Sequence, residues 1–171
     1  MTAQAMQGTR ARVQIIGPEF AQWDALLGLI QASFAYMQGR INPPSSALGL
    51  DAAALAARAK TETLIVAQAQ NGTLLGCAFC ARQQDALYIG KLAVSIGHQG
   101  QGLGRQLLAA ATDLARQQGL GLLRLQTRVE LVENQRAFAA MGFVETARSA
   151  HAGFAQPTSI TMEKHLVAIT P

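Results

Sequence analysis

The sequence has few of the features that mark secreted, membrane-spanning or nucleic-acid-binding proteins. Only 14% of its 171 residues are charged, 5% are aromatic and two are cysteines. No window approaches about 18 uninterrupted apolar residues, and the N-terminal stretch lacks the apolar core of a secretory signal. We therefore expect no membrane partner and a cytoplasmic location.

Positive charge is in slight excess but is nowhere concentrated. Lys and Arg number 14 against 10 Asp and Glu, a formal net charge of +4, and 11 of these cations are arginines. Arginine suits phosphates and carboxylates, which is compatible with an anionic ligand. The cations are scattered from Arg10 to Lys164 with no basic run, so we expect no nucleic-acid partner.

The two cysteines do not indicate a metal or redox site. Cys77 and Cys80 form one CxxC pair inside a stretch that is typical of a strand. Zinc would need a second pair, and a redox motif would need a helix start, so we expect two reduced, buried thiols. His98 and His165 offer no ligand spacing either. We predict no metal.

Apolar periodicity predicts an α+β fold in one domain over residues 13–171, after a flexible tail over residues 1–12. The order of elements indicates a mixed, mostly antiparallel sheet with helices on both faces. The expected strands are 13–16, 63–69, 74–82, 86–94, 122–129, 143–148 and 159–164, and the expected helices are 20–37, 51–60, 102–118 and 133–141.

The most informative stretch is a strand that runs through a glycine-rich turn directly into a helix. Gly100, Gly102 and Gly104 alternate with other residues there. Such glycines allow close approach of a ligand to the backbone, and the N–H groups of a helix start can cradle phosphate oxygens. The spacing is not that of the dinucleotide motif GxGxxG, and no GK[ST] follows for a nucleotide P-loop.

This stretch resembles the GNAT superfamily of N-acetyltransferases. Gln99, Gly102 and Gly104 match the family pattern [QR]xxGx[GA], which follows a strand ending in LAV. Downstream, a helix, a strand, a helix ending at Gly142–Phe143 and a closing strand pair come in the family order. The resemblance covers residues 13–166 and implies a GNAT-like sheet and the cosubstrate acetyl-CoA.

The resemblance also implies where acetyl-CoA binds. In the family the LAV strand splays from the next strand, and the pantetheine arm enters the gap. Carried over to this chain, Leu92, Ala93 and Val94 line the arm. The pyrophosphate would be wrapped by the backbone of Gln99, Gly100, Gln101, Gly102, Leu103 and Gly104. Arg105 is either its charge partner or a solvated helix residue.

Two positions depart from the family's usual catalytic residues. The oxyanion donor is normally a backbone N–H on the LAV strand, here of Leu92 or Val94. The common glutamate base falls at Tyr88, and the two-residue period predicts that Tyr88, Gly90, Leu92 and Val94 share one face. The common tyrosine acid falls at Phe138, which has no proton to donate.

If the reaction occurs, groups other than the family's usual base and acid must accept the amine proton and protonate the leaving thiolate. Tyr88 or water would protonate the leaving thiolate, although Tyr88 can also be an ordinary half-buried strand residue. Glu130 would relay a proton through water or, alternatively, be a solvated loop residue. Asn134 would contact pantetheine or only cap its helix.

Substrate specificity in the family falls to the loop after the first helix and the turn before the last strand. Tyr36, Arg40, His151 and Phe154 are the candidates here, with Arg40 as a clamp for a substrate carboxylate. We therefore predict an acetyl-CoA-dependent N-acetyltransferase for a primary amine of a small molecule or peptide. A non-catalytic acyl-CoA sensor and a glycine-loop nucleotide enzyme are the alternatives, and homodimer formation stays open.

Overall fold

Seven strands form one sheet in the computed structural model of the protein, which describes residues 10–168. The strand order is β1-β2-β3-β4-β5-β7-β6, and only β4 and β5 run parallel. The strands are β1 (Arg12–Ile15), β2 (Thr63–Gln68), β3 (Leu74–Arg82), β4 (Leu87–Val94), β5 (Leu122–Arg128), β6 (Val144–Ser149) and β7 (Ser159–His165). The helices are α1 (Trp23–Phe34), α2 (Ala52–Arg58), α3 (Leu103–Gln117) and α4 (Val132–Ala140).

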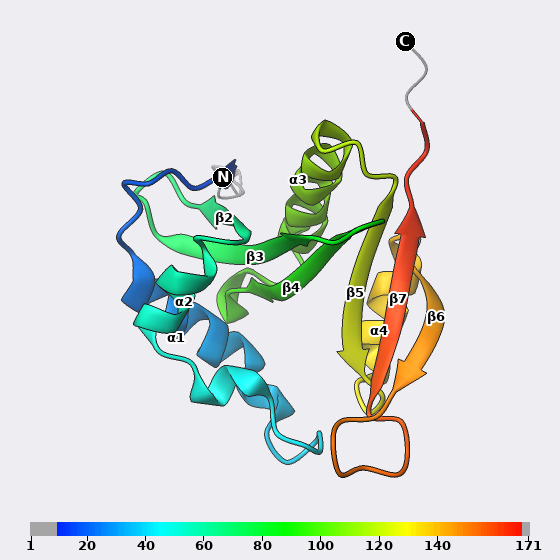
Figure 1. The fold of residues 1–171 in the computed structure, drawn as a ribbon. Helices are drawn as coiled ribbons and strands as arrows, with labels where there is room; N and C mark the ends of the chain where they lie inside the picture. The colour runs from blue at the N-terminus through cyan, green and yellow to red at the C-terminus, as the bar shows by residue number, and fades with distance from the viewer. Residues whose placement is uncertain (1–9, 169–171) are drawn as a thin grey trace, which may run out of the picture.

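Helices cover both faces of this sheet, as expected from the sequence. Leu26 and Ile30 of α1 and Leu55 of α2 pack with Phe79 of β3 on one face. The apolar stripe of α3 packs on the other face together with strands from both halves of the sheet. Figure 1 shows α1 and α2 on one side of β3, and α3 on the other. The predicted α+β fold is confirmed.

Local sequence explains most element boundaries. Asp51 caps α2 by accepting a hydrogen bond from the N–H of Ala54 at 2.7 Å, and Gly72, with φ of 85°, closes the predicted β2–β3 hairpin. The helix expected over 20–37 is shorter, because the chain first makes a turn in which the N–H of Phe20 donates to the carbonyl oxygen of Gly17 at 3.1 Å, and residues 35–37 form a 3-10 turn. β1 already begins at Arg12, inside the expected tail, whose residues 1–9 lie outside the described part.

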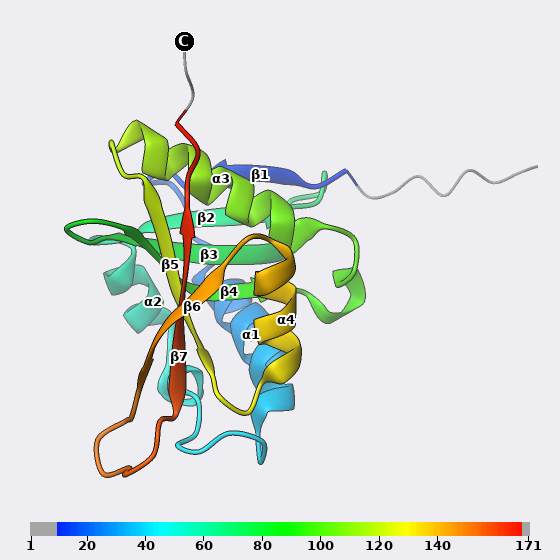
Figure 2. The same ribbon diagram turned by 90° about the vertical axis from the view of Figure 1, so that its right-hand side faces the viewer.

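The sheet opens between β4 and β5. These strands are paired only where Leu87 faces Leu123 and Tyr88 faces Arg124. Beyond Tyr88 they diverge (Figure 1), and Figure 2 shows β5, β7 and β6 running steeply across the direction of β1–β4. The splay that the family resemblance implied is therefore present, and it begins before the LAV segment.

Candidate active site

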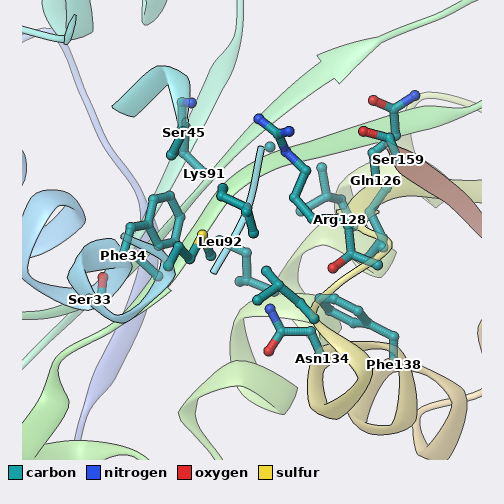
Figure 3. A pocket seen from close by; sticks show the side chains of 18 of the residues that line it. Ser33, Phe34, Ser45, Lys91, Leu92, Gln126, Arg128, Asn134, Phe138 and Ser159 are labelled. Carbon is teal, nitrogen blue, oxygen red and sulfur yellow. The ribbon is translucent and has the colours of Figure 1, made fainter. Parts of the chain in front are cut away.

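A cavity of about 790 Å³ lies where β4 and β5 separate. Its walls come from β4, β5, α4, the end of α1 and the loop that follows α1. A volume of this size is in the range of small-molecule sites, which is about 300–1,000 Å³. Figure 3 shows side chains from these elements around it. The predicted site residues that line it are Tyr36, Tyr88, Leu92, Ala93, Val94, Gln99, Gly104, Asn134, Phe138 and His151.

The glycine-rich turn connects the end of β4 to α3 beside this cavity. Gly100 and Gly102 have φ of 76° and 82°, a conformation that favours glycine, and Gly102 is the residue before the first turn of α3. A Cβ built on Gly100, Gly102 or Gly104 would meet no other protein atom within 4 Å. The turn thus presents open backbone, and the N–H groups of the α3 start have no intrahelical acceptor. Such a surface fits a phosphate group.

The side chains of this segment have different surroundings. Gln99 donates from Nε2 to the carbonyl oxygen of Val94 at 3.3 Å, so it fixes the turn to the end of β4. Leu103 is buried in the core under α3. Gln101 and Arg105 are exposed and do not line the cavity. The side chain of Arg105 therefore has the solvated position that was its alternative assignment.

β4 contains a bulge beside the cavity. In the register with β3, Phe79 faces Gly90 and Cys77 faces Ala93, so β4 has one extra residue over this span. Lys91 in the bulge has φ of 49°, which L residues adopt rarely. Its carbonyl oxygen accepts a hydrogen bond from the Cys77 thiol at 3.4 Å.

The bulge overturns the predicted face of β4. Ile89 lies in the core under α3, so Tyr88 and Gly90 face the opposite side. Leu92 and Val94 pack against the core under α3 as well. The prediction that Tyr88, Gly90, Leu92 and Val94 share one face is wrong, because the extra residue reverses the alternation. The cavity therefore receives side chains from both faces of β4.

Tyr88 lies on the α1–α2 side of this strand, near a mixed group of charges. Its ring is half-buried and lines the cavity. Burial raises the pKa of the Tyr88 hydroxyl, Arg58 opposes this shift and Glu62 adds to it. Its hydroxyl therefore stays protonated above its ordinary pKa, and burial makes it a weaker acid than a solvated tyrosine.

Three cationic side chains on the cavity wall were not predicted from the sequence. They are Arg58 at the end of α2, Lys91 in the β4 bulge and Arg128 at the end of β5. Burial lowers the pKa of Lys91, Arg58 and Arg128 lower it further, and Glu62 opposes them. Arg128 could have been suspected, because it ends the strand that borders the expected splay.

α4 forms the opposite wall of the cavity. Phe138 packs edge-on against Phe143, with ring centroids 5.9 Å apart, and Asn134 and Phe138 extend from α4 in Figure 3. Asn134 does not cap its helix. Its Nδ2 donates to the Tyr36 hydroxyl at 2.9 Å, which joins α4 to the turn after α1.

The remaining predicted substrate residues differ in their relation to the cavity. Arg40 is exposed and forms an ion pair of 2.6 Å with Glu133, and its guanidinium lies 5.7 Å from the centre of the Tyr36 ring. Arg40 is therefore already paired with a carboxylate of the chain itself. His151 lines the cavity and contacts Thr158, whereas Phe154 does not line it.

Several predictions concern residues away from the cavity wall. Glu130 is exposed and does not line the cavity, so it has the solvated position that was its alternative assignment. Cys77 and Cys80 are free and buried, as predicted. Within residues 10–168, no group of His, Cys, Asp and Glu side chains has the arrangement to hold a metal ion. No helix in that range is long and apolar enough to cross a membrane.

Comparison with known proteins agrees with the fold and the glycine-rich turn. The profile of the Acetyltransferase (GNAT) family matches residues 23–143. A search of the curated proteins found no match.

Solved structures share the fold at low sequence identity. The ribosomal-protein-S18-alanine N-acetyltransferase of Escherichia coli is 18% identical, with a TM-score of 0.69 over 94% of this chain and 97% of that one. A GNAT acetyltransferase of Staphylococcus aureus is 16% identical, with a TM-score of 0.70 over 91% and 100%. A GNAT acetyltransferase of Elizabethkingia anophelis with acetyl-CoA bound is 18% identical, with a TM-score of 0.64 over 91% and 98%.

Proposed function

Because the chain belongs to the GNAT acetyltransferase family, whose members use acetyl-CoA, we propose that it transfers an acetyl group to a primary amine of a small molecule or peptide. One observation carries this proposal: the split between β4 and β5 and the glycine-rich turn border the same cavity. The split leaves room for an extended arm, and the turn offers a place for phosphates at its end.

The residues of the turn and of β4 fit this cosubstrate. A Cβ on Gly100, Gly102 or Gly104 would have open space within 4 Å, which supports the assignment of the pyrophosphate to this turn. Leu92, Ala93 and Val94 line the cavity along β4, next to the pantetheine arm. The thioester then lies farther along β4, towards the bulge.

The chemical step needs a neutral amine and a donor for the thioester oxygen. The amine nitrogen attacks the carbonyl carbon and loses a proton to water, the C–S bond breaks, and the thiolate takes a proton. Lys91 and Leu92 have no register partner in β3 or β5. At the bulge these two residues are therefore outside the regular pairing of β4 with its neighbouring strands. The N–H of Leu92 is our choice for the oxyanion donor.

The proton for the thiolate does not come from Phe138, because its side chain has no donor. Water is our first choice, since a thiol has an ordinary pKa of about 8.5 and its anion is a tolerable leaving group near neutrality. Tyr88 is the other candidate, because its hydroxyl carries a proton and the residue lines the cavity, but the burial that raises its pKa also makes it a weaker acid. Glu130 is not retained in the proposal, since it is exposed outside the cavity wall.

The test is release of free CoA thiol from acetyl-CoA in the presence of a panel of amines. The proposal predicts release that depends on both the protein and a particular amine. The alternative function is a non-catalytic acyl-CoA-binding domain, which is favoured by Phe138 and by the lack of a carboxylate at Tyr88. It predicts tight CoA binding without release for any amine.

A further inference from the structure

Three cations converge on the cavity from parts of the chain that are distant in sequence. Arg58 lies over the Phe79 ring, with its guanidinium carbon 5.4 Å from the ring centre, and pairs with Glu62. Its Nη2 would lie 3.4 Å from a Cβ at Gly90, so this glycine leaves room for the guanidinium against β4. Lys91 is the next residue of β4 after Gly90, and Arg128 is the last residue of β5.

These cations retain unused hydrogen-bond donors. Within residues 10–168, Nη1 of Arg128 is buried and has no hydrogen-bond partner, while Nη2 donates to the carbonyl oxygen of Pro44 at 3.3 Å. Nζ of Lys91 donates to the Ser46 hydroxyl at 2.8 Å, and an ammonium has two further protons. An unpaired buried guanidinium N–H is costly unless a ligand accepts from it.

The positive charge of this wall exceeds the negative charge beside it. Glu62 pairs with Arg58, and Glu133, a carboxylate on the cavity wall, pairs with Arg40. Lys91 and Arg128 have no carboxylate partner among the ion pairs of residues 10–168. Glu130 is the nearby carboxylate that opposes the lowering of the Arg128 pKa by burial, but it is exposed and outside the cavity wall. The guanidinium of Arg128 extends towards the side of Lys91 and Ser45 in Figure 3.

This wall lies apart from the place that the fold offers to the phosphates of acetyl-CoA. The glycine-rich turn follows the carboxyl end of β4, whereas Arg58 lies at Gly90, before the bulge. The anion that these cations attract therefore belongs to the second substrate.

We propose that the acceptor amine carries a carboxylate or a phosphate monoester, which Arg128 and Lys91 bind, with the charge of Arg58 on the same cavity wall. This inference rests on the proposed function for the identity of the ligand as an acceptor. Either oxyanion suits this pair of residues. Arginine binds it through paired N–H donors, and lysine binds it as a compact positive charge. Arg40, the cation that the sequence suggested for this role, is occupied by Glu133.

Calorimetric titration of the protein saturated with CoA tests this directly. One arm compares a set of amino acids with their carboxamides, and the other compares ethanolamine with O-phosphoethanolamine. Removing a charge-assisted hydrogen bond typically weakens binding about tenfold or more. We expect at least one anionic amine to bind about tenfold tighter than its neutral counterpart, and the arm in which this occurs identifies the oxyanion.

Substitutions then test whether Arg128 and Lys91 cause the preference for anionic over neutral amines. Arg128→Gln should remove most of the difference between the anionic and the neutral amine, Arg128→Lys should restore part of it, and Lys91→Gln should reduce it independently. Arg148→Gln removes the same charge from β6, where Arg148 pairs with Glu145 away from the cavity, and should leave the difference unchanged. Melting temperatures verify that each variant is folded.

The inference is overturned if no anionic amine binds, if neutral amines bind equally well, or if folded Arg128→Gln and Lys91→Gln both keep the difference. It is also overturned if Arg128→Gln weakens CoA binding instead, or if only Arg40→Gln removes the difference. The titration needs no turnover. Failure of CoA to bind, or of bound amines to be acetylated, refutes the proposed function. Titration of the protein without CoA then still tests whether these cations bind an anionic amine, which would be a ligand and not an acceptor.

Discussion

Replacing Gly104 separates cosubstrate binding from folding. Gly104 is the second residue of α3 and lines the cavity, and a Cβ placed on it would have open space within 4 Å. Because glycine is about 0.8–1 kcal/mol less favourable than alanine in a helix, Gly104→Ala should stabilise the protein. For a chain of this length that is an increase in melting temperature of about 2–4 °C.

The two substitutions Gly104→Ala and Gly104→Val should differ in CoA binding. Alanine is permitted at this position by the family pattern, so Gly104→Ala should bind CoA nearly as well as the unmodified protein. The branched side chain of Gly104→Val points into the space assigned to the pyrophosphate. Loss of one charge-assisted hydrogen bond costs about 1.5–3 kcal/mol, which weakens binding about 10-fold to 100-fold.

Calorimetric titration with CoA, together with thermal melting, measures both effects. Gly104→Val should keep a melting temperature at or near that of the unmodified protein, because valine is no worse a helix former than glycine. Undiminished CoA affinity in the folded Gly104→Val protein would refute the assignment of this turn to the pyrophosphate.

Three further predictions concern titratable groups. With water as the proton source, pH–rate profiles should rise with pH and change little in Tyr88→Phe; a loss of about 10²-fold, with disappearance of a descending limb above pH about 10, would make Tyr88 the acid. Burial raises the pKa of Cys77 and Cys80 to about 12, so a disulfide reagent should label them only after unfolding, and rapid labelling of the native protein would contradict their burial. A hydrogen bond from Thr146 lowers the pKa of Glu163, so its stabilising effect is present above the ordinary pKa of about 4.3 and is lost as pH falls through the lowered value. Urea unfolding of Glu163→Gln should therefore show less stability at neutral pH and a smaller loss on acidification, whereas parallel losses would contradict this.

Several element boundaries were predictable because their signals are local. Asp51 caps α2, Gly72 turns the β2–β3 hairpin, and Gly102 precedes α3, all within a residue or two of the expected places. The resemblance to the family added the splay of β4 from β5, which no local pattern encodes. Of these features, the start of α3 and the splay lie on the cosubstrate side of the cavity.

The acceptor side was not predictable in the same way. In the β4 bulge the positive φ falls on Lys91 and not on the neighbouring glycine. The one extra residue there makes the side chains after the bulge point to the opposite face from the one that simple alternation predicts. Arg58 and Arg128 meet Lys91 only because α2 and the end of β5 border the same cavity. Arg40 has the right residue type for an anion, but its partner Glu133 lies on α4, far away in sequence.

The most direct test of the proposed function is transfer of an isotopically labelled acetyl group from acetyl-CoA to amines of the anionic and neutral panels, measured as N-acetyl product by mass spectrometry. The account predicts a labelled product with at least one amine, formed in equal amount with free CoA, and a slower reaction with Gly104→Val at limiting acetyl-CoA. Tight binding of acetyl-CoA without a labelled product from any amine would contradict it and would favour the non-catalytic alternative.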